Sequence, residues 1–228
     1  MKRCFYIAFG FLTGASVCSA AVTLDSLFGP LFNASGNAVP DGTLWVLVAD
    51  SDVDSSFGVF DIDENLYDAN TASPGVADLY FTTGQSISLG NSLADGTVFA
   101  MGEVNGALNA LPGAITGPIE FDLGANGAAS NRAFAVFFFP GATFSGDQNN
   151  AQTISNQVGG FHTSSDDGGI FDIGMILPAD GNYTAGATNA DGGGTFANRT
   201  FTAVFIPEPS TAFLAAIGSL VLLRRRRN

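Results

Sequence analysis

Between residues 22 and 206, apolar residues never keep a helical period over the length of a helix. They occur instead in short runs that are rich in aromatic and β-branched residues. Turn signals separate these runs, among them Asp41-Gly42, Asp95-Gly96 and Asn126-Gly127, and these residue types tolerate the positive φ angles of tight turns. The pattern predicts an all-β domain, a sandwich or jelly roll of about nine short antiparallel strands.

One run, Ala133–Phe139, is apolar on both faces and is predicted to be a central strand covered on both sides. The alternative is a phenylalanine patch that docks on a partner. Residues 180–196 are rich in Gly, Ala, Asn and Thr and are predicted to form a loop. The expected strands are Leu44–Ala49, Phe57–Ile62, Leu79–Thr82, Ile87–Leu89, Val98–Val104, Ile119–Leu123, Ala133–Phe139, Ile170–Leu177 and Phe201–Ile206.

The chain is acidic, and most of its eight basic residues lie at its two ends. Between residues 21 and 206, twenty acidic residues stand against Arg132 and Arg199 alone, a net charge of about −18. Such a surface repels phosphate backbones, so the composition excludes nucleic acid as a partner. The hydrophobic content of 46% argues against a disordered chain.

Residues 1–20 have the three parts of a secretory signal peptide: basic residues, a short apolar run and small residues before the cleavage site. We expect signal peptidase to cleave after Ala20, although cleavage after Ala21 satisfies the same rule. The apolar run is too short to span a bilayer, which disfavours an anchoring helix. A lipoprotein site at Cys18 is a second alternative. The other cysteine, Cys4, also lies in this segment, so the mature chain would contain no thiol.

Residues 207–228 form a tail with three parts: a proline-containing motif, an apolar stretch from Ala212 to Leu223 and an arginine cluster. A helix from Ser210 to Leu223 would be about 21 Å long, short for the ~30 Å hydrocarbon core of a bilayer. Arginine snorkelling closes part of this gap, and the cluster keeps its end on the cytoplasmic side. The motif and the cluster are Pro207, Glu208, Pro209 and Arg224, Arg225, Arg226, Arg227.

Together with Ile206 before the motif and Ser210-Thr211 after it, this tail resembles the PEP-CTERM sorting signal, also named the ice-binding protein C-terminal motif. The resemblance covers only the tail, and Ile206 replaces the more usual Val. It implies processing by an exosortase in a Gram-negative-type cell. The C-terminal helix would anchor the protein in the inner membrane until cleavage, and the cell surface or extracellular matrix would be its destination. The alternative is a plain anchor that is never processed.

A calcium site is the one cofactor site that the sequence puts forward. Asp50, Asp52 and Asp54 alternate along the chain and Asp61 is the twelfth residue of the segment, which resembles a calcium-binding loop. The sixth position holds Ser55 where a sharp turn favours glycine, and the twelfth holds the shorter Asp in place of Glu. The alternative is an acidic hairpin loop in a protein that is acidic throughout.

Catalytic patterns are weak. His162 is the only histidine, and no G-x-S-x-G elbow accompanies it, which favours a loop histidine without a catalytic role. Glu120 and Asp122 lie two apart on an expected strand and so share a face, and a pair of carboxylates can hydrolyse a glycoside. The simpler interpretation is a solvent-exposed face opposite the apolar residues of that strand. We therefore expect no enzymatic activity.

These observations predict one exported acidic β-sandwich domain, residues 21–206, between the signal peptide and the tail. We expect a structural or adhesive role at the cell surface or in the exopolysaccharide matrix of a biofilm. Divalent cations would bridge its carboxylates to anionic exopolysaccharide. The alternative is a carbohydrate-binding or glycoside-hydrolysing sandwich of the same matrix. Ice binding would require regular rows of Thr, and the sequence contains no such repeat.

Overall fold

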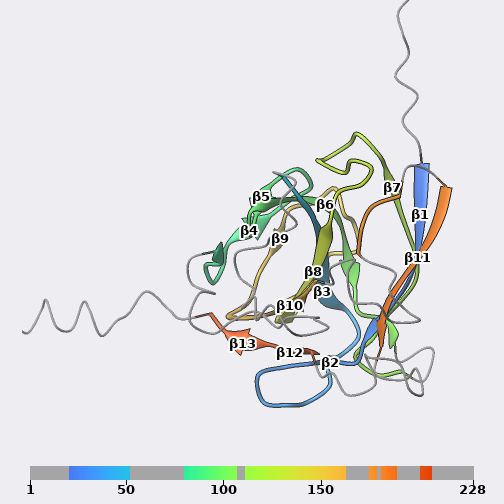
Figure 1. Cartoon of the computed structure of the whole chain (residues 1–228). Coiled ribbons are helices and arrows are strands. Elements are labelled where there is room, and N and C mark those ends of the chain that lie inside the picture. Colours follow the sequence, from blue (N-terminus) through green and yellow to red (C-terminus); the bar gives the residue numbers. More distant parts are fainter. Residues whose placement is uncertain are drawn as a thin grey trace, which may run out of the picture.

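The computed structural model describes residues 21–51, 80–106, 111–162, 175–178, 181–188 and 201–206 (Figure 1). The regular structure of these residues consists of strands, which confirms the expected all-β class. The expected signal peptide, the tail and the strand Phe57–Ile62 lie outside the described residues. The strands are β1 (Ala21–Gly29), β2 (Leu31–Phe32), β3 (Thr43–Asp50), β4 (Ser86–Ile87), β5 (Ser92–Leu93), β6 (Gly96–Glu103), β7 (Ile115–Asp122), β8 (Phe134–Thr143), β9 (Gln152–Thr153), β10 (Gln157–Phe161), β11 (Gly181–Thr188), β12 (Phe201–Thr202) and β13 (Val204–Phe205).

The strands form two main sheets. The larger sheet has six strands in the order β13-β10-β8-β3-β6-β5, and the smaller has three in the order β11-β1-β7. Two short pairs, β12 with β2 and β4 with β9, complete the arrangement. In Figure 1, the blue β1 and the orange β11 run side by side at one edge of the molecule, while β3 and β8 cross its centre.

Two strand pairs are parallel, so the expectation of antiparallel strands throughout is wrong. β1 pairs with β11 in parallel, and β2 also pairs with β12 in parallel. The Gly-rich segment that was expected to be a loop supplies β11, in which Gly181 is the partner of Val22. Asp-Gly and Asn-Gly pairs predict tight hairpin turns between consecutive antiparallel strands. Parallel strands are joined by long connections, so these pairs do not predict them.

Apolar side chains of the two main sheets meet in one core. Leu24 and Phe28 from β1 and Ile115 from β7 belong to the same buried cluster as Trp45 of β3 and Phe138 of β8. A second buried cluster covers the opposite face of the six-stranded sheet and includes alternate residues of β3. The larger sheet therefore has a packed apolar layer on each face, and the smaller sheet closes one of them.

β8 confirms the expected central strand. Phe134, Val136 and Phe138 point into the core shared with β1 and β7, and Phe137 and Phe139 point into the opposite cluster. All five side chains are 0% exposed. These phenylalanines fill the interior on both sides of the sheet, so the alternative of an exposed docking patch is wrong.

Glycines on the neighbouring strand make room for these rings. Gly159 and Gly160 of β10 are the strand partners of Phe138 and Phe137. A Cβ on Gly160 would lie 2.5 Å from Cδ1 of Phe137, and one on Gly159 would collide with the ring of Phe138. Large rings on one strand and glycines on the next allow close packing in the centre of the sheet.

Some apolar runs that were expected to be strands are buried without regular pairing. Tyr80–Thr82 lies outside any strand, and Phe81 is nevertheless 1% exposed because its ring centroid lies 5.4 Å from that of Phe137. Of Ile170–Leu177, the described residues form only an isolated bridge between Ile176 and Ala133. The strand expected at residues 87–89 is reduced to the two-residue β4. These apolar runs are buried with little regular strand pairing, although residues 175–177 exchange backbone hydrogen bonds with residues 131–134.

Candidate functional site

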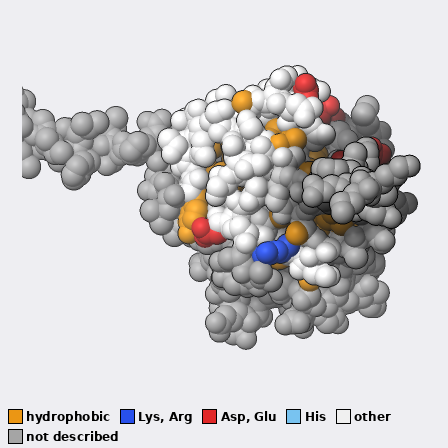
Figure 2. All heavy atoms as spheres, turned by 90° about the horizontal axis from the view of Figure 1, so that it is seen from above, with side chains coloured by type: hydrophobic (Ala, Val, Ile, Leu, Met, Phe, Trp, Pro, Cys, Tyr) orange, Lys and Arg blue, Asp and Glu red, His pale blue; other side chains and the backbone are white. Residues whose placement is uncertain are grey.

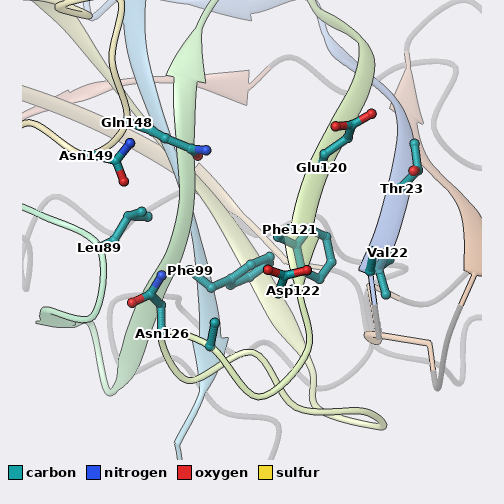
Figure 3. Close-up of a pocket in the computed structure, with 12 residues that line it drawn as sticks. Val22, Thr23, Leu89, Phe99, Glu120, Phe121, Asp122, Asn126, Gln148 and Asn149 are labelled. Atoms are coloured by element: carbon teal, nitrogen blue, oxygen red, sulfur yellow. The ribbon is translucent and has the colours of Figure 1, made fainter. Parts of the chain in front are cut away.

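A cleft with a volume of about 520 Å³ lies where the beginning of β1 and the end of β7 approach the middle of β6. Figure 3 shows Glu120 and Thr23 along one wall and Gln148, Asn149 and Leu89 along the other. Two phenylalanine rings lie between the walls (Figure 3). The cleft is therefore lined by carboxylate, amide and aromatic groups from segments that are distant in sequence.

β7 supplies the carboxylates of the cleft. Glu120 and Asp122 are exposed. Their neighbours on the strand point the other way: Ile119 is 9% exposed and Phe121 is half-buried. This alternation confirms the expectation that the two carboxylates share the solvent face of their strand. Antiparallel pairing with β1 fixes the position of this end of β7, since Asp122 is the partner of Ala21.

Aromatic rings in edge-to-face contact form the floor of the cleft. The centroids of Phe121 and Phe99 are 4.8 Å apart with an interplanar angle of 66°. Phe99 in turn makes a perpendicular contact with Phe134, at a centroid distance of 6.1 Å and an angle of 88°. Phe99 is 3% exposed, and so it supports the half-buried Phe121 from beneath. Edge-to-face pairs of this kind hold a ring in a defined orientation.

The wall formed by Gln148 and Asn149 belongs to a loop held from inside by Gln152. The side chain of Gln152 is 2% exposed. Its Nε2 donates to Ser145 Oγ at 2.8 Å and to the carbonyl oxygens of Asn150 and Asp147 at 2.7 and 3.1 Å. Its Oε1 accepts from the Ser145 backbone N–H at 2.9 Å. One buried amide therefore fixes the loop that presents the polar wall.

Negative charge dominates the cleft. None of the described residues that line it is a lysine or an arginine, and Glu120 and Asp122 contribute the formal charges. The view in Figure 2 shows a face with few charges, where carboxylates lie at separate points among mainly uncharged atoms. Within the described part of the chain, Arg132 is the only basic residue, and it lies outside the lining of the cleft.

A second feature lies at the C-terminal end of the described residues. β13 pairs with β10, and the next residue, Ile206, donates its backbone N–H to the Asn156 carbonyl at 2.9 Å. Ile206 is 3% exposed, whereas Phe205 before it is 55% exposed. The chain is therefore fixed to the six-stranded sheet up to the residue that precedes Pro207.

Residues 205–227 match the family described as the PEP-CTERM protein-sorting motif. The chain carries a PEP-CTERM sorting tail. No curated protein and no solved structure matches the chain significantly. The PEP-CTERM motif implies export, anchorage in the membrane before cleavage, and processing by an exosortase.

The PEP-CTERM match overlaps the folded domain by two residues, because it begins at Phe205 in β13. Pro207, Glu208 and Pro209, the apolar stretch and the four arginines lie outside the described residues. In the part of the chain that the structure describes, no helix is long and apolar enough to cross a membrane.

His162 is a buried residue in the segment that follows β10. It follows β10 directly, is 8% exposed, and has Nδ1 3.3 Å from the carbonyl oxygen of Phe134. The expectation of a loop histidine is confirmed in that His162 lies outside any strand, and the structure adds that its side chain is buried. The nearby Ser164, Ser165, Asp166 and Asp167 lie outside the described residues.

Of the four expected calcium ligands, only Asp50 is described. It ends β3, its side chain is 2% exposed, and its backbone N–H donates to the Ala133 carbonyl at 2.9 Å. Asp52, Asp54 and Asp61 lie outside the described residues. Among the residues that are described, no group of three or more His, Cys, Asp or Glu side chains is placed to hold a metal ion.

The aromatic floor and the amide wall of the cleft were not anticipated from the sequence. Asn126 was recognised only as part of a turn, and it adopts the left-handed conformation with a φ of 49°. Gln148 and Asn149 belong to a polar loop with no distinguishing pattern. The pair of carboxylates on β7 is the feature of the sequence that indicates this cleft. The aromatic and amide groups come beside these carboxylates only through the tertiary fold.

Proposed function

We propose that this protein is an exported structural or adhesive component of the cell surface or extracellular matrix, delivered through its signal peptide and sorted by an exosortase. The observation that carries the proposal is the match of residues 205–227 to the PEP-CTERM motif. Tails of this kind act at the membrane, so the domain in front of the tail is the part that performs the extracellular role.

The short distance between domain and motif supports a sorting event at the surface of the folded domain. Ile206 is buried and hydrogen-bonded to the sheet, and Pro207 follows it directly. In the sequence, no linker therefore separates the motif from the last residue that is bonded to the sheet. After cleavage, the domain would end at this edge, with the exposed Phe205 close to the new C-terminus.

A binding role fits the described groups better than a catalytic one. The carboxylates of Glu120 and Asp122 are both exposed on one strand face, beside amides and aromatic rings. General acid catalysis by a carboxyl group relies on an environment that favours its protonated form, such as an apolar pocket. Exposed carboxylates next to amides are instead suited to accept hydrogen bonds from a ligand.

Intact mass of the protein from its native host, measured separately in cell envelope and medium, tests the proposal. We expect a species that begins at Ala21 and ends near Pro207, with any additional mass identifying an attached group. Replacement of Pro207, Glu208 and Pro209 by alanine should leave the unprocessed chain in the membrane. A wild-type species that retains Arg224–Arg227 and stays in the membrane would refute sorting by an exosortase.

A further inference from the structure

We propose that the cleft between β1, β6 and β7 binds a neutral, hydroxyl-rich saccharide chain. This inference deepens the proposed matrix role and rests on it, because it names the chemical class of the matrix partner. It draws on three features of the cleft: its hydrogen-bonding groups, its aromatic floor and the sign of its charge.

The walls of the cleft match the hydroxyl groups of a sugar. The carboxylates of Glu120 and Asp122 each offer two acceptor oxygens, and the amides of Asn126, Gln148 and Asn149 offer both donors and acceptors. A sugar hydroxyl donates one hydrogen bond and accepts others, so it needs both kinds of partner. Hydrogen bonds to a charged carboxylate are stronger than those between neutral groups.

The floor matches the apolar C–H face of a sugar ring. Phe121 is half-buried, so part of its ring faces the cleft while the contact with Phe99, at a centroid distance of 4.8 Å, fixes its orientation. A rigid aromatic surface provides contact area with little loss of conformational entropy on binding. An aromatic floor between two polar walls suits a ligand that has apolar faces and a polar perimeter.

The charge of the cleft selects a neutral chain. Glu120 and Asp122 carry negative charge, and none of the described lining residues carries a compensating positive charge. A uronate or a sulfated sugar would place its anion beside these carboxylates, and juxtaposed like charges weaken binding. This expectation differs from bridging to an anionic polymer by divalent cations, which would act on carboxylates anywhere on the surface.

The size and rigidity of the cleft are suited to a segment of a polymer. Its volume of about 520 Å³ falls within the ~300–1,000 Å³ range of small-molecule sites. Both walls are fixed in advance: strand pairing with β1 holds β7, and the buried Gln152 amide holds the loop of Gln148 and Asn149. Preorganisation of this kind reduces the entropic cost of binding.

The test measures binding by the full chain, purified in a detergent without a sugar headgroup so that the detergent does not compete. Calorimetric titration would use neutral cello-, malto- and laminari-hexaose and the neutral polymer fraction of the host's own matrix, with oligogalacturonate as the charged probe. The Glu120→Gln/Asp122→Asn variant removes both charges while preserving shape. Glu103→Gln is the matched control, because Glu103 is exposed at the end of β6 and does not line the cleft.

We expect at least one neutral probe to bind, with an affinity that falls by about tenfold or more in the double variant and is unchanged in the control. Oligogalacturonate should bind at least about tenfold more weakly than the best neutral probe. Equal melting temperatures of the three proteins would show that folding is unaffected.

Absence of binding to every neutral probe, binding that survives the double exchange, or preference for oligogalacturonate would each overturn the inference. The matrix role is tested separately by the location and mass of the native protein. A correctly sorted protein in the matrix that binds no neutral saccharide would refute the cleft inference alone.

Discussion

The indole ring of Trp45 lies directly over Gly102, its partner across the β3–β6 pair. A Cβ on Gly102 would lie only 2.5 Å from Cζ2 of this ring. Trp45 is 5% exposed, and its buried Nε1 has no hydrogen-bond partner among the residues that the structure describes. The packing of the ring against glycine, rather than a polar contact of the indole, therefore holds this side chain in place.

We expect Gly102→Ala to lower the free energy of unfolding by about 1–3 kcal/mol, because the new methyl group overpacks a filled core. In a Trp45→Phe background, the same change should cost less, because the smaller ring leaves room for the methyl group. Urea denaturation of the two single variants and the double variant measures this coupling. Equal costs in both backgrounds would show that Trp45 is not what limits the space at Gly102.

Gln152→Leu should destabilise the protein by about 1–3 kcal/mol, because it removes the part-buried hydrogen bonds that join Gln152 to Ser145, Asp147 and Asn150. If the cleft binds saccharide as proposed, the same change should also weaken that binding by loosening the loop that carries Gln148 and Asn149. Denaturation and calorimetric titration measure the two effects.

Gln148→Ala serves as the contrasting variant for Gln152→Leu. Gln148 is exposed at the rim, so its replacement should weaken binding and leave stability within about 0.5 kcal/mol of wild type. If Gln152→Leu left both stability and binding intact, the loop would be held by other contacts.

A four-residue Gly-Ser-Gly-Ser spacer between Ile206 and Pro207 should accelerate removal of the tail. In the native chain, the motif begins directly after the buried, hydrogen-bonded Ile206, and a spacer would separate the motif from that residue. Pulse-chase labelling in the native host follows the conversion. The same spacer after Gly36, in an exposed turn, is the control, and equal rates for both insertions would argue against limited access.

Calcium should raise the melting temperature if residues 50–61 form the predicted loop, because a ligand that binds only the folded state stabilises it by mass action. Comparison of melting in excess Ca²⁺ and in chelator measures the shift. Asp52→Asn/Asp54→Asn should abolish it, whereas Asp50 is a poor target because its side chain is 2% exposed and its loss would disturb β3. An unchanged melting temperature on calcium addition would count against the site.

The pKa of the Tyr80 phenol is raised above its ordinary value, first by burial and then by the negative charge of Asp95 and a hydrogen bond to it. The phenol therefore contributes stability that is present below the pKa of an unfolded tyrosine and is lost as the pH rises through the higher folded value. Asp95→Asn should lower this pKa and leave it above normal, since burial persists. Ultraviolet titration against a Tyr80→Phe reference measures it, and an unchanged pKa in Asp95→Asn would exclude the role of Asp95.

The strands that could be predicted are those whose own residues show a long apolar run or a regular alternation of apolar and polar residues. β3, β6 and β8 are long apolar runs, and the alternation Ile119-Glu120-Phe121-Asp122 places β7 and its exposed carboxylates correctly. These features depend on local periodicity, which the sequence displays directly.

The elements that could not be predicted depend on distant partners. β11 consists mainly of small and polar residues, and its parallel pairing with β1 makes it a strand. β1 itself was missed although Val22 and Leu24 alternate with polar neighbours, and both are buried by residues that follow much later. The cleft has the same origin, because only tertiary packing brings the loop of Gln148 and Asn149 opposite Glu120.

The parallel pairing of β1 and β11 also determines when the domain can complete its folding. Val22 pairs with Gly181, 159 residues later in the chain, so a chain that crosses the membrane from its N-terminus delivers β1 long before the strand that must lie beside it. The three-stranded sheet stays incomplete until almost the whole domain has emerged, and contacts between such distant segments form slowly. β12 and β13 follow soon after β11, and the sorting motif comes directly behind them. The three-stranded sheet can therefore be completed only when the tail is about to reach the membrane.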